Sequence, residues 1–182
     1  DACGARTAAD VRAILDRAEA VGVQAAVTIA DDLDSARWVA AASGWDERLY
    51  GAVALHPTRV DALTGDARAE LESLASHPRV VAIGETGLDL YWPGKLDGCA
   101  DPATQREAFA WHIDLAKRTG KPLMIHNRDA DAEVLDVLRA EGAPETVIFH
   151  CFSSGPEMAR SCLDAGWVLS LSGTVSFRNA RD

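Results

Sequence analysis

Short apolar runs alternate with helix-like segments along the chain, and this alternation constrains the fold more than any other feature. The expected strands are Gln24–Ala30, Leu49–Leu55, Val80–Ile83, Pro122–His126, Thr146–His150 and Trp167–Leu171. The run Val80–Ile83, for example, is rich in β-branched residues and too short for a helix. Alternation of this kind predicts an α/β fold, in which a parallel sheet carries helices on its faces.

Apolar residues at helical spacing fill the intervals between these strands. The expected helices start near Thr7, Asp31, Asp66, Pro102, Asp129 and Gly155. Thr7 with Asp10 three residues later has the pattern of a helix N-cap. Residues 91–102 are expected to form a long loop, and loops of that length beside a strand end are often functional.

Three expected strands end in residues that bind metal ions. Glu85 follows the third strand, with a glycine turn expected before Asp89, whereas His126 and His150 end two later strands. All strand carboxyl ends of an α/β barrel open onto one face, so these side chains are expected to converge. One carboxylate and two imidazoles in a cleft predict a metal site. Such chemistry on strands far apart favours a TIM (β/α)8 barrel over a doubly wound open sheet.

The length of the chain is short for a complete barrel. Eight βα units need about 250 residues, whereas the chain has 182 and its pattern begins with a helix. We therefore expect residues 1–182 to form a single barrel domain that lacks the first strand and the last βα unit. A polypeptide of these residues alone would expose edge strands, so we expect it to be poorly soluble.

Other residues near the strand ends have several roles open to them. His56 also ends a strand, and it is a candidate metal ligand, substrate contact or general acid, or structural residue. Asp89 is expected to cap the loop or to orient a ligand from behind. Arg128 lies two residues beyond His126, on the same side of an extended strand, and is a candidate for binding a phosphate.

The remaining aromatic and imidazole side chains divide into two groups. Tyr91 and Trp92 lie in the long loop, where they are candidates for stacking on a nucleobase. His77 at a helix end and His112 in mid-helix are interpreted as structural residues.

The composition limits the partners and the compartment. The net charge of −10 argues against a broad phosphate-binding surface. It is compatible with a nuclease, because bound divalent cations are often the largest local charges in a site. No apolar run is long enough for a membrane span, and no signal peptide is visible. Cys3, Cys99, Cys151 and Cys162 form no C-x-x-C pair, which favours reduced thiols in a cytoplasmic protein.

Six segments of the chain, in this order and at this spacing, resemble the TatD family of metal-dependent deoxyribonucleases. They are Gly51–Pro57, Ile83–Asp89, Gln105–His112, Ile125–Ala130, His150–Ser153 and Leu171–Phe177. The resemblance implies a TIM-barrel hydrolase that binds two divalent metal ions, magnesium or manganese in cells, with zinc tolerated. It also implies that Glu85 bridges both ions and that His126 and His150 hold one of them.

The family also carries an H-x-H pair on the first strand and an aspartate at the end of the last strand. Neither is present in the sequence, and Asp1 matches the residue just after the missing pair. Three expected metal ligands are therefore absent from these 182 residues.

The resemblance implies cleavage of phosphodiester bonds in DNA, as a 3′-5′ exodeoxyribonuclease with a water activated by two metal ions. Glu85, His56 and Arg128 would be its catalytic residues, and single-stranded DNA or 3′ ends its partner. A monomer is expected. One alternative is a metal-dependent deacylase or amidohydrolase on the same barrel, since the same ligands suit attack on a carbonyl. Another is a binding scaffold without activity.

Overall fold

A computed structural model describes residues 4–178 and residue 180, so Asp1 and Cys3 lie outside the described residues. Six strands of the described residues form one sheet whose order follows the chain. They are β1 (Ala26–Ile29), β2 (Leu49–Val53), β3 (Val80–Asp89), β4 (Leu123–Arg128), β5 (Val147–Phe149) and β6 (Val168–Leu169). All neighbouring strands are parallel. A doubly wound sheet would reverse its strand order at a switch point, and this sheet does not.

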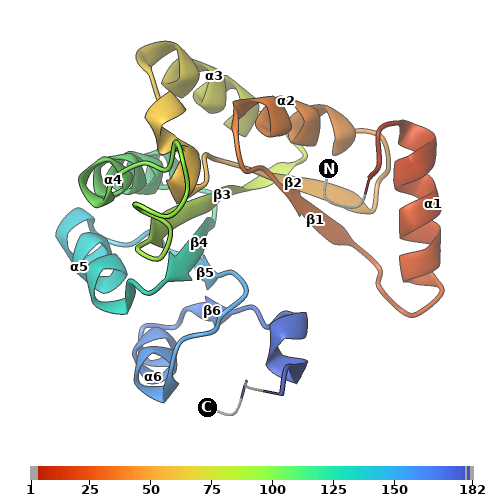
Figure 1. Cartoon of the computed structure of the whole chain (residues 1–182). Coiled ribbons are helices and arrows are strands. Elements are labelled where there is room, and N and C mark those ends of the chain that lie inside the picture. The colour runs from red at the N-terminus through yellow and green to blue at the C-terminus, as the bar shows by residue number, and fades with distance from the viewer. Residues whose placement is uncertain (1–3, 179, 181–182) are drawn as a thin grey trace.

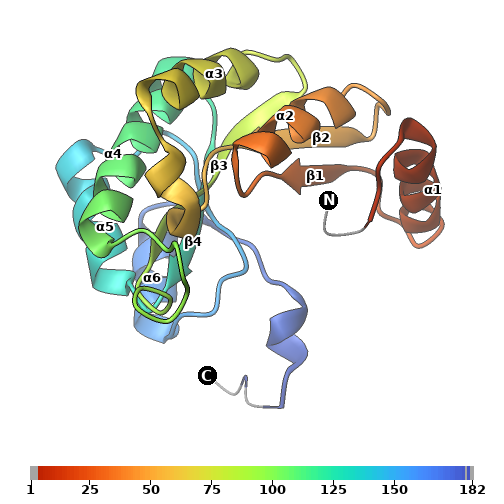
Figure 2. The ribbon, with the colours of Figure 1, turned by 45° about the horizontal axis from the view of Figure 1, so that its top comes forward.

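The helices lie around the outside of a curled sheet (Figures 1 and 2). They are α1 (Ala8–Glu19), α2 (Leu33–Ala42), α3 (Gly65–Ala75), α4 (Pro102–Thr119), α5 (Asp131–Glu141) and α6 (Pro156–Asp164), with the 3-10 helices η1 (Pro57–Ala62) and η2 (Gly173–Ser176). Within the described residues β1 and β6 do not pair, so the sheet is an open part of a barrel. The predicted TIM-barrel architecture, incomplete in this chain, is confirmed.

The main core lies between the sheet and the helices. Phe109 and Ile113 of α4 are fully buried there, together with Ile83 of β3 and Leu71 of α3. A separate small cluster on the strands unites Ala52, Ala82 and Met124. Because side chains alternate along a strand, these three line the opposite, inner face.

β3 differs from its prediction in one respect that matters for the site. The glycine turn expected between Glu85 and Asp89 is wrong, because Val80–Asp89 is one continuous strand. The register shifts between Ile83 and Thr86, where Gly84 and Glu85 lie opposite the single Met124 of β4. This is a β-bulge, which turns a side chain away from its regular direction. Gly84 is required there, since a Cβ would lie 2.5 Å from the Cβ of Met124.

Local signals in the sequence are otherwise followed closely. The predicted N-cap at Thr7 is confirmed as a capping box, in which Thr7 Oγ1 accepts from the Asp10 amide at 3.2 Å. The sequence pattern does not predict the 3-10 helix η1. This helix follows from Pro57 at its first position and from His56 Nδ1, which accepts the Thr58 amide at 3.3 Å.

Two compositional features concern the whole chain. Cys99, Cys151 and Cys162 carry free thiols. None of the helices in the described part of the chain combines the length and apolar character that a bilayer span needs.

Candidate metal centre

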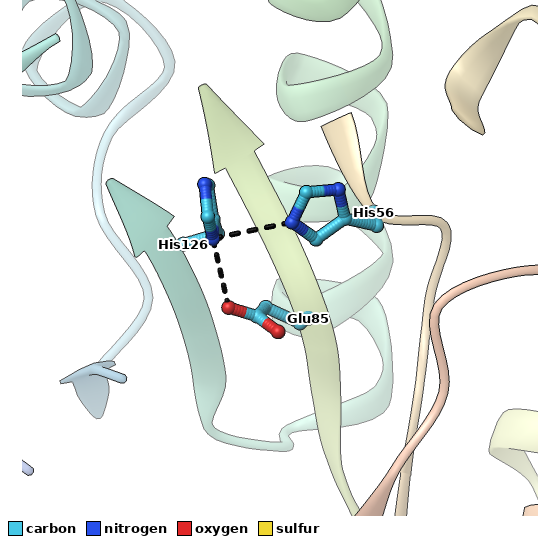
Figure 3. A group of neighbouring side chains, drawn as sticks. All are labelled: His56, Glu85 and His126. Atoms are coloured by element: carbon cyan, nitrogen blue, oxygen red, sulfur yellow. Dashed lines mark hydrogen bonds and ion pairs between the residues drawn. The ribbon is translucent and has the colours of Figure 1, made fainter. Parts of the chain in front are cut away.

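Three side chains from neighbouring parts of the sheet meet at its carboxyl edge (Figure 3). His126 of β4 places Nδ1 3.0 Å from Glu85 Oε1 of β3. Nε2 of His56, which follows β2, lies 3.2 Å from the same nitrogen. One donor atom from each residue lies within 4.8 Å of the other two. Glu85 and His126 are therefore brought together as predicted.

A buried carboxylate orients His126 from behind. Asp89 Oδ2 lies 2.9 Å from His126 Nε2, and the Asp89 side chain is 0% exposed. An ionised carboxylate only accepts, so Nε2 carries a proton and donates it to Asp89. The other Asp89 oxygen accepts the amides of Tyr91 and Trp92, each at 3.0 Å. Both roles expected of Asp89, capping the loop and orienting a histidine, are thus present in its contacts.

The charges in the site are strongly coupled. Burial, and then the neighbouring His126, lowers the pKa of His56 to about 4, so His56 is neutral at pH 7. Burial opposes protonation of His126, but the hydrogen bonds to Glu85 and Asp89 outweigh it and raise the pKa of His126. Burial also favours a neutral Glu85, yet the hydrogen bond and charge of His126 lower the pKa of Glu85. The arrangement therefore favours an ionised Glu85 in contact with a protonated His126, whereas His56 is neutral.

His112 of α4 supports both neighbouring strands from the core side. Its Nδ1 lies 2.8 Å from the Ala108 carbonyl and 3.0 Å from Thr86 Oγ1, and its Nε2 accepts the Leu55 amide at 3.4 Å. Leu55 precedes His56 and Thr86 follows Glu85. The structural interpretation of His112 agrees with its full burial.

The residues present fit a divalent cation. Two imidazole nitrogens and one carboxylate oxygen form the donor set, which zinc, manganese and related ions accept. Ligand atoms that share one cation at 2.0–2.2 Å lie about 3.0–3.5 Å apart, and the contacts of His126 Nδ1 to Glu85 and His56 fall in that range. A histidine that gives its far N–H to a carboxylate is the usual arrangement of a metal ligand.

His150, which the sequence also predicts as a ligand, lies outside this group of three. Its amide donates to the Ile125 carbonyl at 2.9 Å, which fixes the chain beside β4. Its ring Nε2 lies 3.2 Å from the Sγ atom of Cys151. The charge of His150 is nevertheless among the causes that lower the pKa of Glu85. The third residue of the group is therefore His56, whereas the sequence favours His150 as the third ligand.

Arg128 extends from the end of β4 toward the long loop. Its guanidinium carbon lies 3.9 Å from the centre of the Tyr91 ring and 5.3 Å from that of Trp92. It also borders an open cavity of about 440 Å³ that Asn127, Asp131, Ser153 and Ser154 help to line. The arginine predicted to bind phosphate therefore lies between an aromatic loop and a polar cavity.

Asp31 is a residue near the site that sequence reasoning missed. The sequence pattern indicates only that Asp31 opens a helix, whose N-cap is in fact Asp32. The Asp31 carbonyl accepts the His56 amide at 2.8 Å. Desolvation, and then the charge of Glu85, raises the pKa of the Asp31 side chain. The available signal was its place just beyond the carboxyl end of β1, where barrel strands open onto the site.

Comparison with known proteins assigns the chain to a family. The family model described as "TatD related DNase" matches residues 3–182. A Mycobacterium tuberculosis protein named "Uncharacterized metal-dependent hydrolase TatD" is 75% identical over 182 residues, which are 100% of this chain and 69% of that protein. A Bacillus subtilis protein named "Uncharacterized metal-dependent hydrolase YabD" is 35% identical over 94% of this chain and 66% of its own length.

Two further similarities concern a named activity and a solved structure. A Cronobacter turicensis protein named "3'-5' ssDNA/RNA exonuclease TatD" is 32% identical over 89% of this chain and 60% of its own length. The crystal structure of the TatD homologue YjjV from Escherichia coli superposes with a TM-score of 0.83 at 27% identity, covering 94% of this chain and 65% of that one. The chain thus spans about two thirds of the length of these relatives. The protein belongs to the TatD-related DNase family.

Proposed function

We propose that this protein is a metal-dependent hydrolase that cleaves phosphodiester bonds in nucleic acid, as a 3′-5′ exodeoxyribonuclease. The observation that carries the proposal is the contact of Glu85 with His126 at 3.0 Å, with buried Asp89 on the far nitrogen of His126. This is the arrangement of a metal ligand at the carboxyl mouth of a barrel, where active sites of this fold lie. The name of the Cronobacter relative supports the choice of substrate.

The residues divide the work by their charge and position. Glu85, His126 and His150 would hold the two divalent cations. When bound, magnesium or manganese supplies Lewis acidity and lowers the pKa of water. His56 is neutral and would donate a hydrogen bond from its ring N–H to the substrate phosphate. Arg128 offers five N–H donors for phosphate oxygens.

Cleavage of labelled single-stranded DNA with Mn²⁺ tests this function. We expect the protein to shorten the strand from its 3′ end, chelator to abolish the reaction, and Glu85→Gln to lower kcat more than about 100-fold. Glu157→Gln, on the exposed start of α6, is the matched control and retains activity. Intact DNA at high protein concentration, with turnover of an acyl-tRNA or an amide, would instead establish the deacylase alternative.

Metal affinity distinguishes the roles of the two flanking histidines. We expect His150→Ala to weaken Mn²⁺ binding in calorimetry, and His56→Ala to lower kcat with little change in affinity. If the three residues whose ligand atoms lie within 4.8 Å of one another, His56, Glu85 and His126, hold the ion, His56→Ala is the variant that should lose affinity. Loss of affinity in His56→Ala alone would show that His56 is the third ligand.

A further inference from the structure

We propose that Lys95 and Arg128, held on the two faces of Tyr91, form a two-cation clamp that binds neighbouring backbone phosphates of a single nucleic acid strand. The clamp deepens the proposed function and rests on it, since it binds the strand beside the candidate metal centre. Tyr91 is a positioning residue in this arrangement, and Lys95 is a binding residue that the sequence did not single out.

The geometry places two positive charges on one aromatic ring. Lys95 Nζ lies 3.7 Å from the centre of the Tyr91 ring, and the Arg128 guanidinium carbon lies 3.9 Å from it. Two cations this close to one centre would collide and repel on a single face, so they cover opposite faces. The negative faces of the ring offset the repulsion between the two charges.

A single buried carboxylate ties the clamp to the metal centre. Asp89 accepts the Tyr91 amide through one oxygen and the His126 ring through the other. Asp89 also pairs with Arg128 in the register of β3 and β4. Tyr91, Arg128 and His126 are therefore fixed relative to one another, which is what a strand lying across both sites requires.

Carboxylates do not neutralise the two cations of the clamp. In this acidic chain Arg37, Arg48 and Arg118 each contact at least two carboxylates. Within the described residues no carboxylate oxygen lies within 4.0 Å of a side-chain nitrogen of Lys95 or Arg128. Their N–H donors remain available, and phosphate oxygens are the acceptors that suit them.

The surroundings of Arg128 have room for the rest of a nucleotide. The open cavity of about 440 Å³ beside it is within the size range of small-molecule sites. Asn127 Oδ1, on a residue that lines this cavity, is a buried acceptor without a hydrogen-bond partner among residues 4–178. Together with Asp131 and Ser154, Asn127 provides acceptors for the amino groups of a base, whereas the Asp131 carboxylate would repel a phosphate.

The clamp also changes the expected role of the loop aromatics. Because both faces of Tyr91 are covered by cations, this ring cannot also stack on a base. Trp92 meets Tyr91 edge-on, with ring centres 4.9 Å apart at 82°. The stacking role expected for the pair therefore falls to Trp92 alone.

Binding of fluorescein-labelled oligothymidylate, measured by anisotropy in chelator, tests the clamp. We expect Lys95→Glu and Tyr91→Leu to raise Kd about 10-fold or more, since each weakens a charge-assisted hydrogen bond to phosphate. The slope of log Kd against log salt should fall by about 0.7 for each phosphate that the variant no longer neutralises. Tyr91→Phe keeps the ring and should restore binding. Arg17→Ala, on the exposed face of α1, is the control and should bind as the wild type does.

Hydrolysis of bis(p-nitrophenyl) phosphate with Mn²⁺ separates this inference from the proposed function. This small diester reports on the metal centre without a bound strand, so Lys95→Glu should raise the KM for DNA by a much larger factor than the KM for the diester. If the wild type cuts DNA but both variants bind it with unchanged Kd and salt slope, the clamp is refuted and the nuclease stands. If the wild type neither binds DNA nor cuts either substrate, both proposals fail. Circular dichroism and thermal melts confirm that the variants fold.

Discussion

Gly87 lies in β3 at a point where a side chain has no room. Its φ is +131°, and a Cβ there would lie 2.1 Å from the His126 carbonyl oxygen. Glycines beside a candidate ligand such as Glu85 suggest space for a bound ion or substrate. Their immediate role is to let β3 and β4 approach closely enough to bring Glu85 and His126 together.

Gly87→Ala should therefore destabilise the protein by more than about 3 kcal/mol, because backbone strain adds to a clash with backbone. Gly94→Ala is the matched control. Its φ is also positive, at +76°, but nothing lies within 4 Å of its Cβ position. It should cost only about 1–2 kcal/mol. Urea denaturation measures both, and equal losses would contradict the account of Gly87.

His112 links stability to pH. Its burial lowers the pKa to about 3, whereas an unfolded histidine titrates near 6.5. Between pH 6.5 and 3 the unfolded chain therefore binds more protons than the folded chain does. The contribution of His112 to the free energy of unfolding is complete above about pH 6.5 and decreases by about 1.4 kcal/mol for each unit by which the pH is lowered. His112→Gln, which cannot titrate, should show a shallower fall between pH 7 and 5 in urea melts. The same slope in both proteins would exclude His112 as the cause.

At the scale of elements, Asp89 connects three of them through one side chain. It ends β3, bonds to His126 of β4, and caps the loop that carries Tyr91 and Trp92. Its own amide donates at 2.8 Å to Gln105 of α4. The loop and the candidate ligand are therefore positioned together and not independently.

Asp89→Asn should separate these roles. The amide oxygen can still cap the loop, but an –NH₂ group facing His126 Nε2 disfavours the tautomer with Nδ1 free for a cation. We expect Mn²⁺ affinity to fall about 10–100-fold in calorimetry with little change in the far-UV spectrum. Asp97→Asn, an exposed residue of the same loop, is the control. Unchanged Mn²⁺ affinity in Asp89→Asn would show that the Asp89 carboxylate does not orient the metal ligand.

At the scale of the whole molecule, the two outermost strands leave apolar side chains in water. Val27 of β1 is 42% exposed and Val168 of β6 is 51% exposed. In the part of the chain that the structure describes, neither strand pairs on its outer edge. Unpaired strand edges with apolar residues are templates for association with other chains.

A polypeptide of residues 1–182 alone is therefore expected to aggregate, as the strand pattern already predicted. Val27→Lys combined with Val168→Lys should lower light scattering at equal concentration, because edge lysines oppose strand pairing. Val21→Lys replaces an 81% exposed valine in the turn after α1 and is the control. A soluble polypeptide that melts cooperatively without any substitution would contradict the prediction.

The sequence was sufficient for the architecture because its information is local. Apolar runs, helix caps and glycine stops determine each element, and thus the alternation that led to a barrel. The spacing of Thr7 and Asp10, for example, was sufficient to predict the N-cap that the structure forms as a capping box. The sequence pattern did not predict η1, because a short 3-10 helix has no periodic apolar pattern. Pro57 at its first position was the available signal.

The sequence by itself determined that Glu85 and His126 end up on one face, because strand-end position in a parallel barrel is a topological property. Only the tertiary structure decided that a bulge at Gly84 and Glu85 turns the carboxylate inward. It also decided that Asp89 contacts the far nitrogen of His126. Finally, it places His56, and not His150, in the group with Glu85 and His126. These outcomes depend on the register between strands and on side-chain packing across elements. Such distances are set by contacts between residues remote in the chain, and no local pattern encodes them.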